Sequence, residues 1–143
     1  MLNNILCATD GSKSSEKAVD FAIKLAQRES AKLTFVTVSL IAADATAKSY
    51  FWDSDVARAG DAQIDKELSA AEAKAKAAGL TNYSSATVYG KNIAASLIEF
   101  AESSGYDHIV TGSIGRTGVS RLLLGSIAYE VVAKAHCPVT IVR

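Results

Sequence analysis

The chain has 143 residues, of which 49% are hydrophobic, so we expect a single domain over residues 1–143 with a sizeable core. Fifteen basic and fifteen acidic side chains balance to zero net charge, which argues against a nucleic-acid-binding protein with a broad basic face. No window holds the ~18 uninterrupted apolar residues of a membrane span, and the only cysteines are Cys7 and Cys137, so we expect no membrane insertion and a cytoplasmic location.

Strand-like and helix-like segments alternate from the N-terminus onward. The apolar run NILCAT (4–9) is typical of a strand buried on both faces, and it ends at the turn residues 10–12. A helix should follow, capped by Ser12 or Ser14, because apolar residues then recur at helical spacing. KLTFVTVSL (32–40) is rich in β-formers and is the second predicted strand.

The middle of the chain is predicted to form a long helix. Residues 41–52 show no regular pattern, and we expect the aromatic residues 50–52 to pack this loop onto the core. The helix should begin at about Ser54 and end at Gly79, which can adopt the left-handed conformation of a C-cap. YSSATVY (83–89) is the third predicted strand.

The C-terminal third repeats the alternation. A third helix, stopped at Gly105, precedes the predicted strand DHIVTG (107–112). A fourth helix follows, and the residue pair at 137–138 breaks it before the last strand, VTIV (139–142). The apolar residues whose spacing marks this helix are Leu124, Ile127, Val131 and Ala135.

This order of elements predicts an α/β fold: a doubly wound, five-stranded parallel sheet of the Rossmann-like type, with helices on both faces. With the strand order 3-2-1-4-5, the winding reverses at the first strand, and ligands bind beyond the carboxyl ends of the strands at such a point. The first and fourth strands are then neighbours. Their exits, at 10–11 and 112–113, should face one crevice.

The segment GSIGRTGVSRLLLGS (112–126) follows the fourth strand and is a candidate phosphate site. Phosphates bind backbone N–H groups, often at a helix N-terminus, where glycine permits close approach. Gly125 and Ser126 open the next helix, and Arg116 would add positive charge. A flexible connector explains the same glycines, so these residues alone leave both interpretations open. The pattern is neither a P-loop nor GxGxxG.

The same segment fits the pattern G-x2-G-x9-G-[ST], and it resembles the ATP-binding motif of the universal stress protein family. ILCATDGS near the N-terminus and HCPVTIVR at the C-terminus resemble that family's first and last strands, so the resemblance covers nearly the whole chain. It implies a nucleotide-dependent stress or signalling module that binds ATP with Mg²⁺. It also implies a homodimer joined through the strand 139–142.

In the family's ATP-binding branch, the glycine motif holds the ribose and phosphates, and the acidic residue after the first strand lines the nucleoside pocket. The resemblance assigns these roles to Gly112, Gly115, Gly125, Ser126 and Asp10. It assigns the adenine contact to the backbone of Val38. Ser113, Arg116 and Ile127 lie beside the glycines and are further expected contacts.

Other functions fit the residues less well. A receiver domain shares the alternation, but it needs acidic residues after the first and third strands and a lysine near the fifth, and only Asp10 matches. No carboxylate and no Walker lysine lies within 112–126, which favours a nucleotide binder over a fast enzyme. A slow ATPase or autophosphorylating enzyme stays an alternative, as does a scaffold that binds AMP or another small molecule. No catalytic residue or metal site is assigned.

Overall fold

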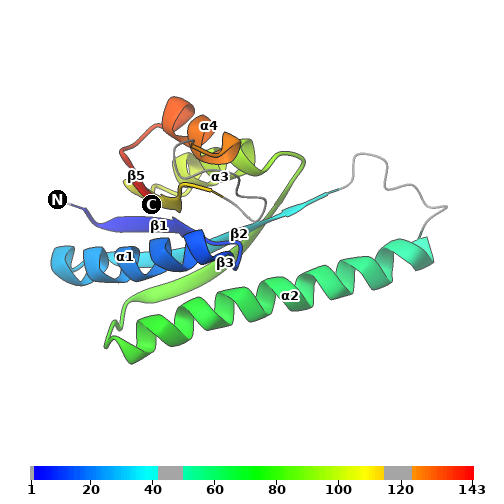
Figure 1. Cartoon of the computed structure of the whole chain (residues 1–143), viewed down its shortest axis with the longest axis horizontal. Helices are drawn as coiled ribbons and strands as arrows, with labels where there is room; N and C mark the ends of the chain where they lie inside the picture. Colours follow the sequence, from blue (N-terminus) through cyan, green and yellow to red (C-terminus); the bar gives the residue numbers. More distant parts are fainter. Residues whose placement is uncertain (1, 42–49, 115–123) are drawn as a thin grey trace.

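The computed structural model of the chain describes residues 2–41, 50–114 and 124–143, with side chains from residue 60 onward in the second range. One parallel sheet in the order β3-β2-β1-β4-β5 runs through the molecule (Figure 1). Its strands are β1 (Asn4–Ala8), β2 (Lys32–Leu40), β3 (Tyr83–Gly90), β4 (His108–Gly112) and β5 (Val139–Val142). The helices are α1 (Lys13–Glu29), α2 (Tyr50–Ala77), α3 (Ile93–Ser103) and α4 (Ser126–Lys134).

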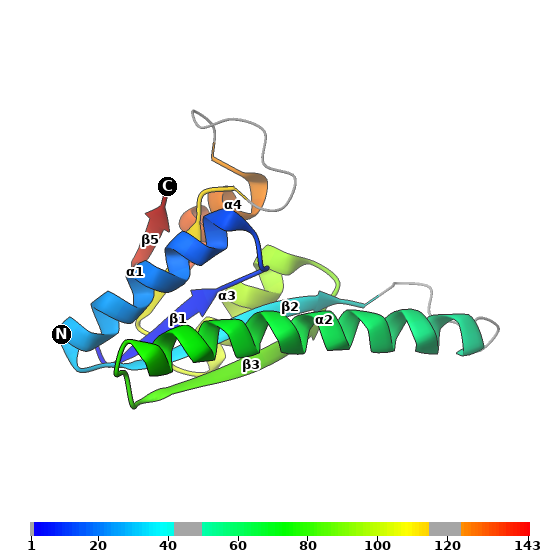
Figure 2. The same cartoon turned by 60° about the horizontal axis from the view of Figure 1, so that its bottom comes forward.

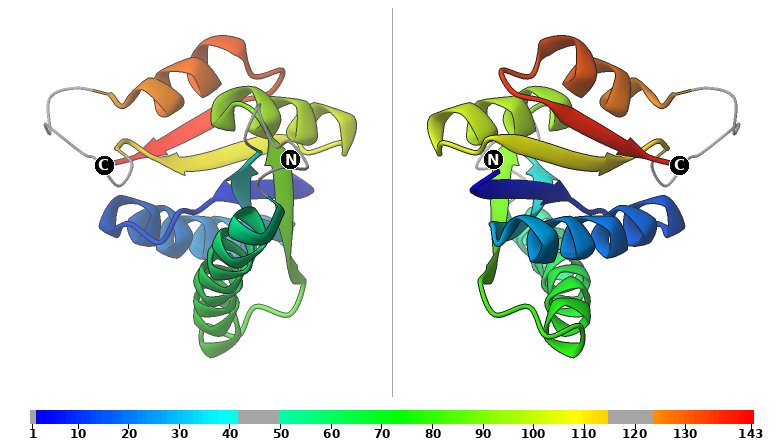
Figure 3. Two further views of the ribbon diagram at one scale, coloured as in Figure 1. Left: turned by 90° about the vertical axis from the view of Figure 1, so that its right-hand side faces the viewer. Right: turned by 90° about the vertical axis from the view of Figure 1, so that its left-hand side faces the viewer.

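The predicted doubly wound topology is confirmed. β1 lies at the centre of the sheet, where Cys7 is in register with Phe35 of β2 on one side and with Val110 of β4 on the other. Helices α1 and α2 cover one face, and α3 and α4 cover the opposite face (Figure 3). The winding therefore reverses at β1, and the carboxyl ends of β1 and β4 lie side by side.

The face under α1 and α2 is closed by large side chains from the strands and small ones from the helix. Leu33 and Phe35 are fully buried there, and α1 contributes the fully buried Ala18 and Ala22. Alanines on the buried side of α1 let this helix lie close to the sheet. Cys7 is part of the same core, and burial raises the pKa of its thiol far above the ordinary value, so it packs as a small apolar group.

The opposite face packs Leu6 and Ile109 of the sheet against Leu97 of α3 and Val131 of α4. α4 begins at Ser126, as expected, and it buries Ala128 and Val131 against this core. Ile127 fits the same helical spacing, but it is 37% exposed.

Helix boundaries follow local capping chemistry. The Ser12 side chain accepts a hydrogen bond from the Ser15 N–H at 3.2 Å, so Ser12 caps α1 and Ser14 lies inside the helix. At the end of α2, Gly79 has φ +84, and the predicted left-handed cap is confirmed. The Leu80 N–H donates to the Ala75 carbonyl at 3.0 Å and closes the last turn.

α2 begins at Tyr50, four residues before the predicted start, so residues 50–52 are helical and do not belong to an irregular loop. The expected packing of their aromatic side chains lies outside the described side chains. The N-terminal part of α2 reaches beyond the ends of β2 and β3 (Figures 1 and 2). No helix in the described ranges combines the length and apolar character needed to cross a membrane.

At the opposite end of the sheet, Asp107 and His108 hold strands together. The Asp107 carboxylate accepts a hydrogen bond from the Asn3 N–H at 2.8 Å. His108 Nε2 forms a hydrogen bond with Thr140 Oγ1 of β5 at 2.7 Å. Burial lowers the pKa of the His108 ring, against a smaller opposing effect of the Asp107 carboxylate. The His108 ring thus links β4 to β5.

Candidate functional site

A cavity of about 150 Å³ opens at the carboxyl edge of the sheet, between the exits of β1 and β4. Its walls come from β1, β2 and β4 and from the N-terminal ends of α1, α3 and α4. The predicted site residues that line it are Asp10, Val38, Gly112, Ser113, Gly125, Ser126 and Ile127. Gly115 and Arg116 lie outside the described residues. The fold thus brings the described candidates, drawn from four separate segments, into one place.

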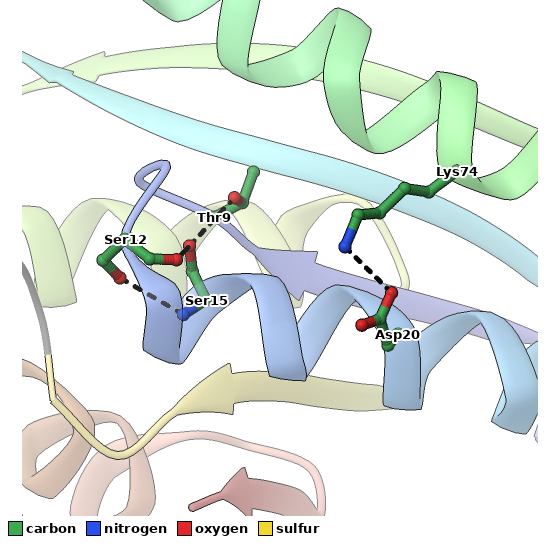
Figure 4. Close-up of polar contacts among 5 residues, drawn as sticks. All are labelled: Thr9, Ser12, Ser15, Asp20 and Lys74. Atoms are coloured by element: carbon green, nitrogen blue, oxygen red, sulfur yellow. Dashed lines mark hydrogen bonds and ion pairs between the residues drawn. The ribbon is translucent and has the colours of Figure 1, made fainter.

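The β1–α1 loop forms one wall of the cavity and is held by short polar contacts. Asp10 Oδ1 accepts a hydrogen bond from the Ser12 N–H at 2.9 Å, across Gly11, which has φ +77. The Thr9 hydroxyl donates to Ser15 Oγ at 3.3 Å, inside the first turn of α1 (Figure 4). One Asp10 oxygen therefore shapes the turn, as Asp-Gly sequences commonly do, while the residue also lines the cavity.

The β2 side of the cavity is mostly apolar. Val36 and Val38 line it from the strand, and Ile93 and Leu97 line it from α3. Thr37 turns its hydroxyl to the Thr9 carbonyl oxygen at 2.7 Å, which ties the ends of β1 and β2 together. This end of the cavity suits a flat, largely apolar group with polar edges.

Gly112 at the end of β4 is required by helix packing. A Cβ at this position would lie 2.4 Å from Ser14 Oγ and 3.0 Å from the Ser14 backbone. A side chain at position 112 would therefore displace Ser14 of α1, so helix packing gives this glycine a second reason beside the expected approach of a phosphate. The Ser14 hydroxyl also accepts a hydrogen bond from the Ile114 N–H at 3.4 Å, which connects α1 to the β4 exit.

The N-terminus of α4 faces the cavity without a capping side chain. Its N-cap is Gly125, and the first turn contains no acidic residue. The Gly125 N–H donates to the Ser113 carbonyl oxygen at 2.7 Å, which fixes the start of the helix against the β4 exit. The first-turn residues Ser126 and Ile127 line the cavity, so the positive end of the helix dipole points toward it.

The N-termini of α1 and α3 have capping side chains. Ser12 caps α1, and Asn92 Oδ1 accepts a hydrogen bond from the Ala95 N–H at 2.9 Å to cap α3. In contrast to α1 and α3, α4 has no side chain among the described residues that caps its first-turn donors.

Among the described residues that line the cavity, Asp10 is the only one with an ionisable side chain. The rest are apolar residues, hydroxyls and backbone. The cavity therefore offers an apolar end, a carboxylate on the β1 side and a helix N-terminus, a set suited to recognising a ligand that joins a ring to an anionic group.

Sequence reasoning missed several residues of the cavity wall. Thr9, Ser15 and Thr37 form the polar contacts behind Asp10, and Ile93 closes the apolar end. The serines after Asp10 were a usable signal, because hydroxyls at the start of a helix commonly bond to the preceding loop. Nothing in the local sequence marks Ile93, which reaches the cavity only because α3 starts beside β2.

Comparison with known proteins identifies the family. The model of the universal stress protein family matches residues 1–143. The chain belongs to this family. The universal stress protein YxiE of Bacillus subtilis is 32% identical over 155 aligned positions, which cover 100% of each chain.

Solved structures of universal stress proteins share the fold. UspA from Lactobacillus plantarum superposes with a TM-score of 0.89 at 24% identity, over 99% of this chain and 98% of its own. A universal stress protein solved in complex with cAMP is 31% identical to this chain, with a TM-score of 0.77, and the match covers 99% and 97% of the two chains.

Proposed function

We propose that this universal stress protein binds an adenine nucleotide in the cavity at the carboxyl edge, that ATP is its ligand, and that residues 1–143 act as one nucleotide-dependent stress or signalling module. The uncapped N-terminus of α4, which opens onto the cavity, carries the proposal. The relative solved with cAMP supports a nucleotide as ligand, because it is 31% identical over nearly the whole chain.

The chemistry of the cavity suggests how the ligand lies. The phosphates meet the first turn of α4 at Ser126 and Ile127, where backbone donors and the helix dipole favour negative charge. Asp10 is the one described carboxylate within reach of a ribose, and the adenine lies against Val38 at the apolar end. In this proposal Gly115 and Arg116 complete the phosphate site from the connecting segment.

Magnesium fits this arrangement as part of the nucleotide. Mg²⁺ keeps several waters and is usually held by phosphates together with one or two protein oxygens. The described lining offers the hydroxyls of Ser113 and Ser126 near the α4 terminus and no cluster of carboxylates there. The ion would neutralise phosphate charge, and these hydroxyls would contact its hydration shell.

A slow ATPase or autophosphorylating enzyme is the second candidate function. Rapid hydrolysis needs a positioned base or water-orienting group beside the γ-phosphate. The described lining has no ionisable group next to α4, since Asp10 lies across the cavity on the β1 side. Contacts that hold the ground state and the transition state equally give affinity rather than rate, so we favour the binder.

ATP with Mg²⁺ should raise the unfolding temperature of the protein. A ligand that binds only the native state adds about 2.7 kcal/mol of stability at a hundredfold excess over its dissociation constant. Differential scanning calorimetry with and without ATP measures the shift. Mass spectrometry of denatured protein shows beforehand whether a nucleotide has co-purified. A ligand-free protein whose melting is unchanged by millimolar ATP would contradict the proposal.

We also propose a homodimer in which β5 pairs with its copy. β5 is an edge strand, and its residues are only half-buried within one chain. On the neighbouring α4, Tyr129 is 65% exposed and Val132 is 50% exposed. An apolar edge strand flanked by exposed apolar side chains is a surface that a second chain can cover.

The substitution Ile141→Lys should convert this dimer to a monomer, because it places a charge within the paired strand. The matched control is Tyr89→Lys, since Tyr89 is exposed on β3, the opposite edge of the sheet. Sedimentation equilibrium at micromolar concentration gives the mass of each variant. A wild-type protein with the mass of one chain would contradict the proposed dimer. Dissociation by Tyr89→Lys but not by Ile141→Lys would contradict pairing through β5.

A further inference from the structure

The loop that carries Asp10 touches the long helix α2 through one buried acidic side chain. Glu67 is 9% exposed, and its carboxyl group occupies the space beside Gly11. A Cβ built at Gly11 would lie 2.9 Å from the Cγ, Cδ and Oε1 atoms of Glu67. The two residues are far apart in the sequence, so this contact joins α2 directly to the wall of the candidate nucleotide cavity.

The contact is itself held in place. Gln63, one turn earlier on α2, donates a hydrogen bond from Nε2 to Glu67 Oε1 at 3.1 Å. Leu68 beside Glu67 is buried in the core, which anchors this turn of the helix to the sheet. The Glu67 side chain thus projects from a fixed backbone toward the loop, and a shift of that carboxyl group requires its hydrogen bond to Gln63 to change.

The loop at 10–12 separates two cavities. On one side is the cavity lined by Asp10, and on the other is a cavity of about 400 Å³ between α1 and α2 that Gly11, Ser12 and Glu67 line. With open space on its α2 side, the loop does not pack continuously against that helix. Glu67 spans the opening, so it limits how far the loop can move away from the nucleotide cavity.

Contacts from α1 hold the same loop from the other side. Ser12 and Ser15 form the helix cap, and Thr9 bonds to Ser15 (Figure 4). The ion pair between Lys74 and Asp20 joins α2 to α1 at 3.1 Å further along the helices, but both side chains are largely exposed, and such pairs contribute little. Glu67 is the α2 side chain whose atoms lie nearest to Gly11 among the described residues.

We propose that Glu67 is a positioning residue for the nucleotide site: by filling the space beside Gly11, its side chain fixes the Asp10 loop at the spacing that nucleotide binding requires. The inference rests on the proposed function. Asp10 Oδ1 accepts from the Ser12 N–H across Gly11, so displacement of Gly11 disturbs both residues of that bond. The Glu67 side chain acts through its size, and its role therefore differs from that of a residue that contacts the ligand.

Two substitutions distinguish size from charge. Glu67→Asp keeps the charge but withdraws the carboxyl group by one methylene, and ATP affinity measured by calorimetry should fall about fivefold, or roughly 1 kcal/mol. Glu67→Gln keeps the size and should bind within about twofold of the wild type. A Glu67→Gln variant that loses as much affinity as Glu67→Asp would overturn the size argument.

Glu72→Asp is the matched control. Glu72 lies on the same helix and accepts a hydrogen bond from Ser85 Oγ of β3 at 2.5 Å, away from the loop. The same shortening there should leave ATP affinity unchanged. In an Asp10→Ala background, Glu67→Asp should cause no further loss, because the effect is transmitted through Asp10. Losses that add fully in the double variant would contradict the proposal.

Amide hydrogen exchange tests the positioning role without any nucleotide. The Ser12 N–H, which donates to Asp10, should exchange faster in Glu67→Asp than in the wild type or in Glu72→Asp. If the wild type binds no ATP, the proposed function fails, and the exchange rate still decides the positioning role. Unchanged exchange at Ser12 would overturn that role. The Ala95 N–H, which donates to the Asn92 cap of α3, is the internal control and should exchange at the same rate in all three proteins.

Discussion

Alanine at Gly112 should lower the free energy of unfolding by about 1–3 kcal/mol, the usual cost of forcing extra atoms into a packed site. The added Cβ would meet Ser14 Oγ at 2.4 Å and the Ser14 backbone at 3.0 Å, so the first turn of α1 has to move away from β4. Urea unfolding of the wild type and the variant measures the difference. Nucleotide affinity should fall as well, because Gly112 lines the cavity and Ser14 accepts a hydrogen bond from Ile114, which also lines it.

Gly60→Ala is the control for this substitution. Gly60 lies inside α2 with no atom within 4 Å of a built Cβ, so alanine should stabilise the helix by up to about 1 kcal/mol. Adding Ser14→Ala to Gly112→Ala removes the nearest clashing atom and should recover part of the loss. If Gly112→Ala unfolds at the wild-type urea concentration, close packing of α1 does not constrain this position.

The fold was predictable because its signals are local. Each buried strand is a short apolar run, as NILCAT (4–9) shows, and each helix has its own periodic stripe and stop signal, such as Gly79. Once five strands alternate with helices, the handedness of the crossovers leaves few topologies, and the order 3-2-1-4-5 is one of them. The start of α2 was placed four residues late because residues 50–52 carry no helical periodicity.

The position of the candidate site was predictable for the same reason. Asp10 and Gly112 follow two strands that the topology makes neighbours, so their meeting required only the strand order. The contacts that shape the site were not predictable. Ser14 beside Gly112 and Glu67 beside Gly11 join residues about 50 to 100 positions apart, and no local pattern encodes how closely two helices approach a strand.

The start of α4 was predictable, because Gly125 and Ser126 were expected to open this helix. Ile127 fits the apolar spacing of the helix, but it is 37% exposed and lines the cavity. The first turn of α4 has no capping side chain. The first backbone N–H groups of a helix need acceptors, and where no side chain caps them a bound anion can take that place.

Aspartate at Ser126 should separate stability from nucleotide binding. Ser126 is the first residue of α4, is exposed and lines the cavity, and the first turn holds no other acid. A carboxylate there complements the helix dipole and should stabilise the fold by about 0.3–1 kcal/mol. Thermal unfolding without ligand measures this gain, and Ser126→Asn shows how much of it comes from the side-chain acceptor alone.

The same carboxylate should weaken ATP binding tenfold or more, about 1.4 kcal/mol or above, because it places a negative charge where the phosphates meet the α4 terminus. Ala133→Asp is the matched control, since Ala133 is exposed in the last turn of α4, at the other end of the helix. That variant adds the same charge, should lose slight stability through the dipole, and should keep its ATP affinity. Titration calorimetry at two salt concentrations checks both, because repulsion between charges weakens with ionic strength. Full ATP affinity in Ser126→Asp would show that the phosphates do not bind at the α4 terminus, whatever the stability of the variant.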